Sequence, residues 1–230
     1  MKLRIGTLAV LVAVIACVPV AAAPIKVNVR VETPTRTIFE GKVTTDTHAP
    51  LTKDDSGSHP CDGTNGGANP TPGPTVTGAL DDAATLGGFQ WAATWSNSFN
   101  DFFINEIGST ATTGAQFWEA ILNFKPTSAG GCQVEIHAGD QVLWAVGGGH
   151  TDKHILKLTG PAHAKAGKPF TVKVVDGKNG AVIKGAKVGG QKTDRKGRAT
   201  LRVGKAGVKK LKATRSDSIR SNQLQVTIGK

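Results

Sequence analysis

The sequence lacks the motifs by which common enzyme classes are identified. It contains no Gly-x-Ser-x-Gly nucleophile elbow and no zinc-protease motif, and its carboxylates form no catalytic constellation. We therefore expect a protein without enzymatic activity, which needs neither a cofactor nor a metal. A secreted enzyme is the alternative.

Long apolar runs are also scarce. The one such run, residues 5–20, has about sixteen residues, fewer than the roughly 20 that a membrane-spanning helix needs. Lys2 and Arg4 precede it and the small residues Ala21–Ala23 follow it, which is the layout of a secretory signal peptide over residues 1–23. We expect a secreted or cell-surface protein with no transmembrane segment in the mature chain.

The cleavage chemistry of this leader has two interpretations. Cutting after Ala23 places Pro24 first in the mature chain, which is disfavoured, and cutting after Ala22 avoids this. The stretch "VIAC" resembles a loose lipobox, and lipoprotein anchoring through Cys17 is therefore the alternative to free secretion.

Cysteine is rare, with three in the chain, and Cys17 belongs to the leader. In an oxidising compartment the remaining two, Cys61 and Cys132, are most simply one disulfide. It would close a loop of about 70 residues and stabilise the fold by about 4 kcal/mol. Two free buried thiols are the alternative.

Charge and aromatic residues divide the mature chain into two parts. Residues 24–149 hold six Lys/Arg and thirteen Asp/Glu, a net charge of −7, with all four Trp and seven of the eight Phe. Residues 150–230 hold twenty Lys/Arg and four Asp, a net charge of +16. We predict two domains, called the head (24–149) and the second domain (150–230), joined within "GGGHTDKH".

The head opens with two alternating runs, "IKVNVRVE" and "RTIFEGKVT", which predict a β-hairpin. A loop over residues 45–75 follows, then an amphipathic helix with Thr77 as a possible N-cap and Gly87–Gly88 as its stop. Four further strands are predicted at "FQWAATW", "DFFINEIG", "QFWEAILNF" and "DQVLWAV".

The second domain consists of short alternating runs broken by Gly, Asp and Asn turns, which predicts a small β-sandwich. The runs are "HILKLTG", "FTVKVVD", "AVIKGAKVGG", "RATLRVG", "KKLKATRS" and "NQLQVTIGK". The fold class is therefore mainly β.

The head resembles a bacterial domain-of-unknown-function family related to the C-terminal domain of transcobalamin, which implies a β-grasp-like α+β fold. The residues that carry this are "VNVRVE", "GAL", the strand before Gly108, "FWEAILNF" and "AGDQVLWAV". Where the family has Trp followed by Asn-Gly, this chain has Trp118 and Asn123, with Phe124 in place of the glycine. The resemblance implies a small ligand, and a corrinoid is the candidate.

The second domain resembles bacterial immunoglobulin-like and carboxypeptidase-regulatory-like surface modules. The matching stretches are "AKAGKPFTVKVVDG", "IKGAKVGG", "KTDRKGRATLRV" and "LKATRSDSIRSNQLQV", with the "TD-x-x-G-x-A" turn at Thr193–Ala199. Such modules are stalks, spacers or adhesive units, so the resemblance implies a fold and no activity.

The tryptophans are the strongest candidates for a ligand site in the head, because indole faces bind apolar and C–H-rich surfaces. Core filling is the competing interpretation. Asp140, preceded by Gly139, could orient a ligand or simply hold a turn. The tentative ligand-binding residues are Trp91, Trp95, Trp118, Asp140 and Trp144.

Three smaller groups could carry chemistry, but each has a plainer interpretation. Asp62 and Asn65 lack the further acids of a calcium loop. His150, Asp152 and His154 lie at the predicted linker, where imidazoles are normally solvated. His59 stands near Cys61, whose thiol the predicted disulfide would occupy.

The charge of the second domain suggests an anionic partner. Export and the lack of aromatic residues for base stacking argue against nucleic acid, which leaves anionic cell-envelope polymers or lipid headgroups. A merely solvated surface is the alternative. The tentative polyanion-binding residues are Arg195, Lys196, Arg198, Lys210 and Lys212, and we expect Lys209 to point away from the last two.

Overall fold

A computed structural model describes residues 23–147 and 153–230. The predicted leader apart from Ala23, including Cys17, lies outside the described residues, as do His150 and Asp152. Within the described ranges, no helix is long and apolar enough to cross a membrane.

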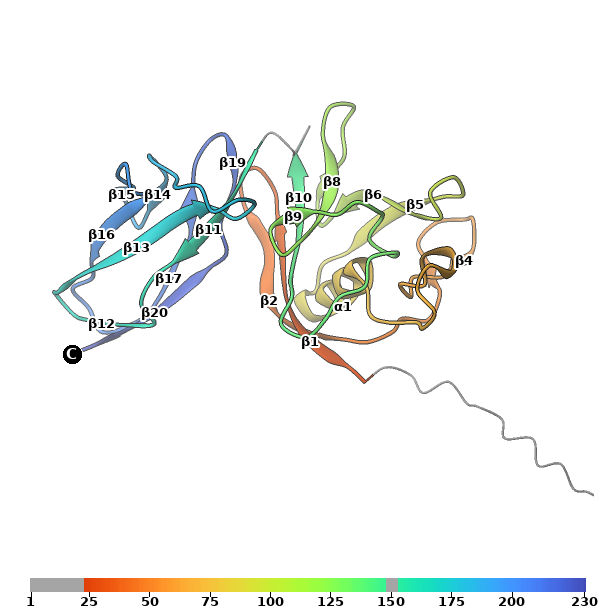
Figure 1. The fold of residues 1–230 in the computed structure, drawn as a ribbon, viewed down its shortest axis with the longest axis horizontal. Helices are drawn as coiled ribbons and strands as arrows, with labels where there is room; N and C mark the ends of the chain where they lie inside the picture. The colour runs from red at the N-terminus through yellow and green to blue at the C-terminus, as the bar shows by residue number, and fades with distance from the viewer. Residues whose placement is uncertain (1–22, 148–152) are drawn as a thin grey trace, which may run out of the picture.

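The head is built on a five-stranded mixed sheet with the strand order β2-β1-β10-β8-β9 (Figure 1). The first and last long strands are parallel neighbours in its centre, and the predicted hairpin of β1 and β2 is confirmed. The strands are β1 (Ile25–Glu32), β2 (Thr37–Thr45), β10 (Gln141–Gly147), β8 (Phe117–Leu122) and β9 (Lys125–Pro126).

The helix α1 (Val76–Gly87) covers one face of this sheet through Val76, Ala79, Leu80 and Ala83, which pack in the head core. The N-cap is Thr75, whose hydroxyl accepts a hydrogen bond from the N–H of Gly78, and not Thr77 as we predicted. Thr75 has the extended backbone that a cap requires, whereas Thr77 is already inside the helix. Gly88, in a left-handed conformation, ends the helix as expected.

A second, three-stranded sheet and the long loop complete the head. This sheet contains β5 (Trp91–Ser96), β6 (Asp101–Ile107) and β7 (Thr110–Ala111). The loop carries β3 (Leu51–Thr52), β4 (Ser58–His59) and the 3-10 turn Asn65–Gly67. The predicted disulfide between Cys61 and Cys132 is confirmed, and it lies buried in the head core with a sequence separation of 71 residues.

The second domain is formed by strands alone, and no helix occurs in its described residues, 153–230, which confirms the mainly β class. A four-stranded sheet contains β16 (Arg198–Arg202), β13 (Pro169–Asp176), β11 (His154–Thr159) and β19 (Ser218–Ile219). A three-stranded sheet contains β12 (His163–Lys165), β20 (Leu224–Gly229) and β17 (Gly207–Leu211). A small third sheet contains β15 (Gln191–Lys192), β14 (Lys187–Val188) and β18 (Ala213–Thr214). One core of aliphatic residues and Phe170 lies between them.

One predicted strand of this domain is much shorter than the sequence pattern indicates. Of residues 181–190, only Lys187–Val188 forms a strand, β14. Gly185 has a φ of +79° and Gly189 a φ of +53°, which interrupt the extended backbone on both sides.

The two domains pack against each other through the second face of the head sheet. Val142 and Trp144 of β10 face α1 in the head core, whereas Leu143 and Ala145 face the second domain and meet its Ile155. In Figure 1 the head sheet accordingly lies between α1 and the second domain. A sheet buried on both faces requires apolar residues at consecutive positions, which explains the unbroken run "VLWAV" in β10.

Charged groups reinforce this junction. The carboxylate of Glu32, 1% exposed, binds both the ammonium of Lys212 and the guanidinium of Arg220. The same ammonium lies 2.7 Å from the carboxylate of Glu40, which also accepts the backbone N–H of Gln223. A buried carboxylate with several donors is costly to leave unpaired, so this network fixes how the domains sit together.

Phe124 also belongs to the junction. It has a φ of +66° in the tight turn between β8 and β9, a conformation that glycine favours and that costs another residue about 1–2 kcal/mol. Its ring is nevertheless buried, with the guanidinium of Arg30 at 5.9 Å and the ammonium of Lys157 at 5.3 Å from the ring centre. Packing against the second domain therefore offsets a locally unfavourable backbone.

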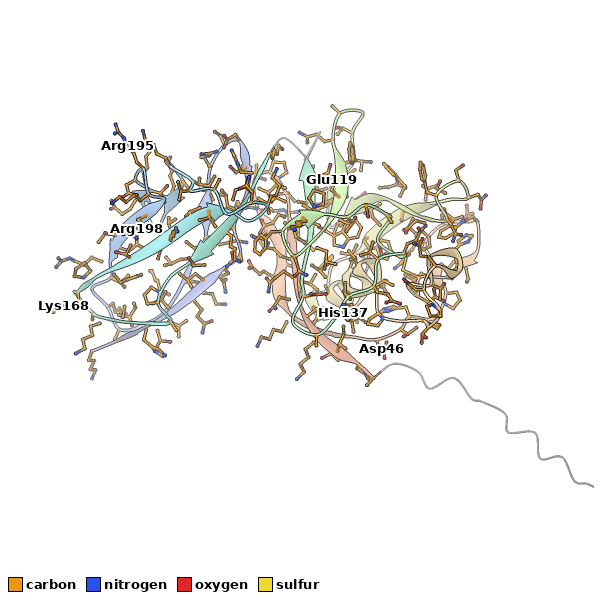
Figure 2. All side chains as sticks on the ribbon, viewed as in Figure 1. Asp46, Glu119, His137, Lys168, Arg195 and Arg198 are labelled. Atoms are coloured by element: carbon orange, nitrogen blue, oxygen red, sulfur yellow. A yellow bond between two sulfur atoms is a disulfide. The ribbon has the colours of Figure 1, made fainter. Side chains whose placement is uncertain are left out.

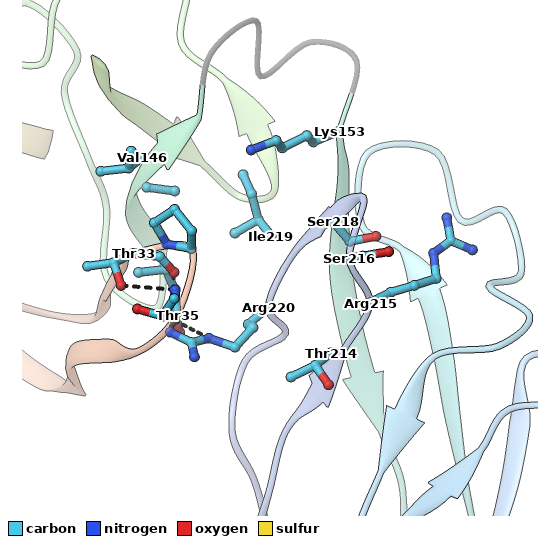
Figure 3. A pocket seen from close by; sticks show the side chains of 13 residues that line it. Thr33, Thr35, Val146, Lys153, Thr214, Arg215, Ser216, Ser218, Ile219 and Arg220 are labelled. Carbon is cyan, nitrogen blue, oxygen red and sulfur yellow. Dashed lines mark hydrogen bonds and ion pairs between the residues drawn. The ribbon is translucent and has the colours of Figure 1, made fainter. Parts of the chain in front are cut away.

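A polar cavity of about 230 Å³ opens beside the junction (Figure 3). Thr33 and Thr35 line it from the head, and Ser216 and Ser218 line it from the second domain. The guanidinium of Arg220, which also lines it, already binds Glu32, so this cation is committed to holding the domains together.

Candidate functional site

Three of the four tryptophans lie in the core of the head. Trp91, Trp118 and Trp144 are between 3% and 7% exposed. Each indole N–H has a partner: the Asp81 carboxylate at 2.8 Å for Trp91, and backbone carbonyls for the other two. Their faces pack against neighbouring side chains and do not form an open stacking platform.

Trp95 is half-buried and closed in by the long loop. The His59 imidazole stacks on its indole with ring centres 3.9 Å apart and planes 5° apart, and Phe102 meets it edge-on. Asp54 from the same loop accepts the backbone N–H of Trp95 at 2.6 Å. These contacts tie the loop to β5, and they give His59 a role unrelated to the sulfur of Cys61, which the disulfide occupies.

The remaining polar candidates of the head hold turns. Asp140 accepts hydrogen bonds from the side chain of Asn123 at 2.8 Å and from the backbone N–H of His137 at 2.7 Å. The Asp62 carboxylate accepts hydrogen bonds from the backbone N–H and the hydroxyl of Thr64. Among the described residues, no group of three or more His, Cys, Asp and Glu side chains could hold a metal ion.

At the start of the second domain, His154 is bound to Asp176 through a ring nitrogen 2.7 Å from the carboxylate. Asp176 is 1% exposed, and it also accepts the N–H of Lys178. His154 is therefore part of the domain's folded framework. The other members of the predicted cluster, His150 and Asp152, lie outside the described residues.

The carboxylates of the second domain that the structure describes are all engaged in local contacts. Asp176 binds His154, and the Asp217 carboxylate accepts hydrogen bonds from two nitrogens of Arg215, at 2.6 and 2.9 Å. Asp194 accepts the backbone N–H groups of Lys196 and Arg198, and that of Arg198 is the main cause of its lowered pKa. These acids therefore neutralise few of the domain's cations.

The cations of the four-stranded sheet gather on its outward face. Lys173 of β13 stands opposite Thr159 of β11 on one side and opposite Arg198 of β16 on the other. Arg202 lies four residues beyond Arg198 on the same strand, about 13 Å away. None of Lys173, Arg198 and Arg202 has an ion-pair partner within the described ranges 23–147 and 153–230. The outward face is called the basic face below, and consists of Lys157, Thr159, Thr171, Lys173, Arg198, Thr200 and Arg202.

The sequence-predicted polyanion residues fall into three places. Arg195 and Lys196 lie exposed in the turn that enters β16, and Arg198 belongs to the basic face; Figure 2 shows Arg195 and Arg198 on the side away from the head. Lys210 is exposed on β17 in the other sheet. Lys212 follows β17 and turns to the head, where Glu32 and Glu40 bind it.

Sequence reasoning missed Lys173 and Arg202 as members of this surface. The signal was present in the period-two patterns "FTVKV" and "RATLR", in which Thr and basic residues alternate with core residues. What the sequence did not contain is the pairing of β13 with β16, which places these positions side by side.

Comparison with known proteins assigns no family to the chain. No protein-family model and no curated protein matches the chain. Among solved structures, the chain is similar to the crystal structure of haptocorrin in complex with Cbi, with 15% sequence identity and a TM-score of 0.36. The match covers 55% of this chain and only 25% of the haptocorrin chain. At this distance the likeness assigns neither a family nor a ligand to the chain.

Proposed function

We propose that the protein is an exported, non-enzymatic, two-domain protein that attaches to an anionic polymer of the cell envelope through the basic face. The head, held rigidly on the second domain, is then presented for recognition of a further partner. The observation that carries this proposal is a sheet face of cations and threonines in a domain whose described carboxylates are already bound.

The physical basis is the field of a domain with a net charge of +16. Exposed charges act over a Debye length of about 8 Å at physiological salt, so cations a strand apart act together on one polymer chain. Threonine hydroxyls between them can donate hydrogen bonds to oxyanions. The leader and the disulfide support an extracytoplasmic site of action, where envelope polymers are available and nucleic acid is not.

A small-ligand function for the head, with a corrinoid as the ligand that the family resemblance implies, has less support. It would need an open apolar platform, and three of the four indoles fill the core. The head therefore enters the proposal as a partner-recognition domain.

The test is binding of the mature chain, residues 24–230, to dextran sulfate across a salt series. We expect salt-sensitive binding that the double variant Lys173→Glu/Arg198→Glu weakens by about tenfold or more, equivalent to about 1.4 kcal/mol. The matched control, Lys26→Glu/Lys125→Glu, makes the same change in net charge on the head and should weaken binding far less. Absence of binding at low salt, or equal losses in the two variants, would contradict the proposal.

A further inference from the structure

The second domain contains a groove of about 660 Å³ at the open edge between its sheets. Three cations line it: Arg202 at the end of β16, Lys205 in the following turn, and Lys209 on β17. No carboxylate is among its described lining residues. The groove therefore combines a concave shape with positive charge that no neighbouring acid neutralises.

The floor of the groove is apolar. Leu201 and Leu211 close it from below, and Pro169 and Val203 contribute apolar surface at its side. A bare inorganic anion would gain nothing from such a floor. A chain that places C–H-rich units between its charged groups would bury apolar surface there and meet the cations at the rim.

The backbone of β16 adds hydrogen-bond donors along one side. Gly197 and Val203 direct their carbonyls to the β13 side, where the N–H groups of Val174 and Gly167 bind them. Because backbone groups alternate in direction along a strand, those of Thr200 and Arg202 point away from β13. Both residues line the groove and β16 is the last strand of its sheet, so the N–H groups of Thr200 and Arg202 can serve as donors there beside the side chains.

We propose that this groove holds one linear strand of an anionic polymer whose repeating units join an oxyanion to a C–H-rich spacer, such as a polyol phosphate or an acidic polysaccharide. This rests on the proposed function and specifies its site, with Arg202 shared between the basic face and the groove. A concave groove fits a single polymer chain, whereas the flat surface of a bilayer can contact only the rim of the groove.

Charge also makes the acidic head of a second copy a competing occupant, since the head carries a net charge of −7. In that case the mature chain would self-associate at low salt without any added polymer. Sedimentation velocity of the mature chain over a range of concentrations measures this. Monomeric behaviour supports the proposal, and salt-sensitive self-association that Lys205→Ala/Lys209→Ala abolishes would overturn it.

The main experiment compares two double variants of the mature chain in binding a dextran sulfate oligomer. Lys205→Ala/Lys209→Ala removes two groove cations, and the control Lys184→Ala/Lys187→Ala removes two exposed lysines of the same domain that do not line the groove. We expect a loss of about tenfold or more for the groove variant and less than about threefold for the control. The magnitude of the slope of log K against log salt should fall by about two in the groove variant, roughly one for each lysine removed.

Two further readouts test the geometry. The backbone amide resonances of Thr200 and Arg202 should shift on adding the oligomer, and the oligomer should bind better than inorganic polyphosphate of equal charge. Equal losses in both variants would overturn the groove while leaving the proposed function in place, and no binding by the unaltered chain would overturn the proposed function itself. Anionic vesicles that bind as tightly as the oligomer, without dependence on Lys205 and Lys209, would also overturn the groove.

Discussion

The two domains reach a stable β fold by different means. The head has a helix, four tryptophans in or beside its core, and a disulfide that anchors a long loop. The second domain has neither helix nor cysteine in its described residues, and its core is made of aliphatic side chains and one ring, that of Phe170. A covalent link stabilises a domain with a long loop by restricting the unfolded chain, whereas the second domain relies on the close packing of its core alone.

The largest expected difference between the domains concerns the disulfide. Replacing Cys61 and Cys132 by Ala removes a constraint on about 70 residues and should destabilise the head by about 4 kcal/mol. All four tryptophans are in the head, so Trp fluorescence during denaturation follows that domain selectively. The fluorescence transition should move to lower denaturant concentration, while amide exchange in β13 and β16 changes much less. An unmoved fluorescence transition would show that the loop is held without the bond.

The second difference between the domains is the response of their stability to pH. In the head, the group concerned is the carboxyl of Asp101. Burial raises the pKa of this carboxyl to about 6, against the effect of backbone N–H groups from Phe102 and Cys132. In the second domain the pKa of Asp194 is lowered, chiefly by the N–H of Arg198. The two domains therefore respond to pH in opposite directions at these groups.

For Asp101, a pKa raised in the folded state means that its stabilising contribution is complete below its ordinary value of 3.8 and is lost as the pH rises to about 6. About two pKa units correspond to about 3 kcal/mol. We expect Asp101→Asn to abolish this part of the pH dependence of the Trp fluorescence transition between pH 4 and 7. His48, whose pKa is raised by the Asp82 carboxylate 3.5 Å away, contributes in the same direction and remains in the variant as an internal reference. A variant with the full slope of the parent chain would exclude Asp101 as the cause.

The smallest expected effect concerns the contact between the domains. Lys212→Met should cost about 2 kcal/mol, less than the roughly 3–5 kcal/mol typical of breaking a buried ion pair, because Glu32 retains Arg220. The matched control is Lys210→Met, an exposed neighbour on β17 that should have little effect. Loss of coupling would appear as separation of the Trp fluorescence transition from the far-ultraviolet circular dichroism transition. Equal effects of the two variants would mean that the ion network does not fix the junction.

Much of the local structure follows from the order of residues along the chain. Period-two alternation predicted most long strands, and Gly88 marked the end of α1 because a left-handed cap favours a residue without a Cβ atom. The predicted helix start was two residues too late, since Thr75 and Thr77 are both chemically able to cap. Only the backbone conformation of Thr75 decides between them.

The sequence predicted that the second domain carries a basic surface, but not which residues form it. The sequence identified a basic domain and included Arg198, yet it also included Lys212, which contacts two carboxylates about 180 positions earlier in the chain. The groove joins Arg202, Lys205 and Lys209 with a floor from β16 and the end of β17, a grouping that depends on how the two sheets pack.

By itself, the sequence determined the mainly β class, the partition of charge and aromatic residues, and the pairing of Cys61 with Cys132, because these depend on composition and local periodicity. The tertiary structure alone decided that the head sheet is buried on both faces, that Phe124 occupies a left-handed turn, and that Lys212 pairs with the head. These features arise from contacts between residues far apart in the chain. Such contacts can outweigh local preferences because leaving apolar surface exposed or a buried carboxylate unpaired costs several kcal/mol.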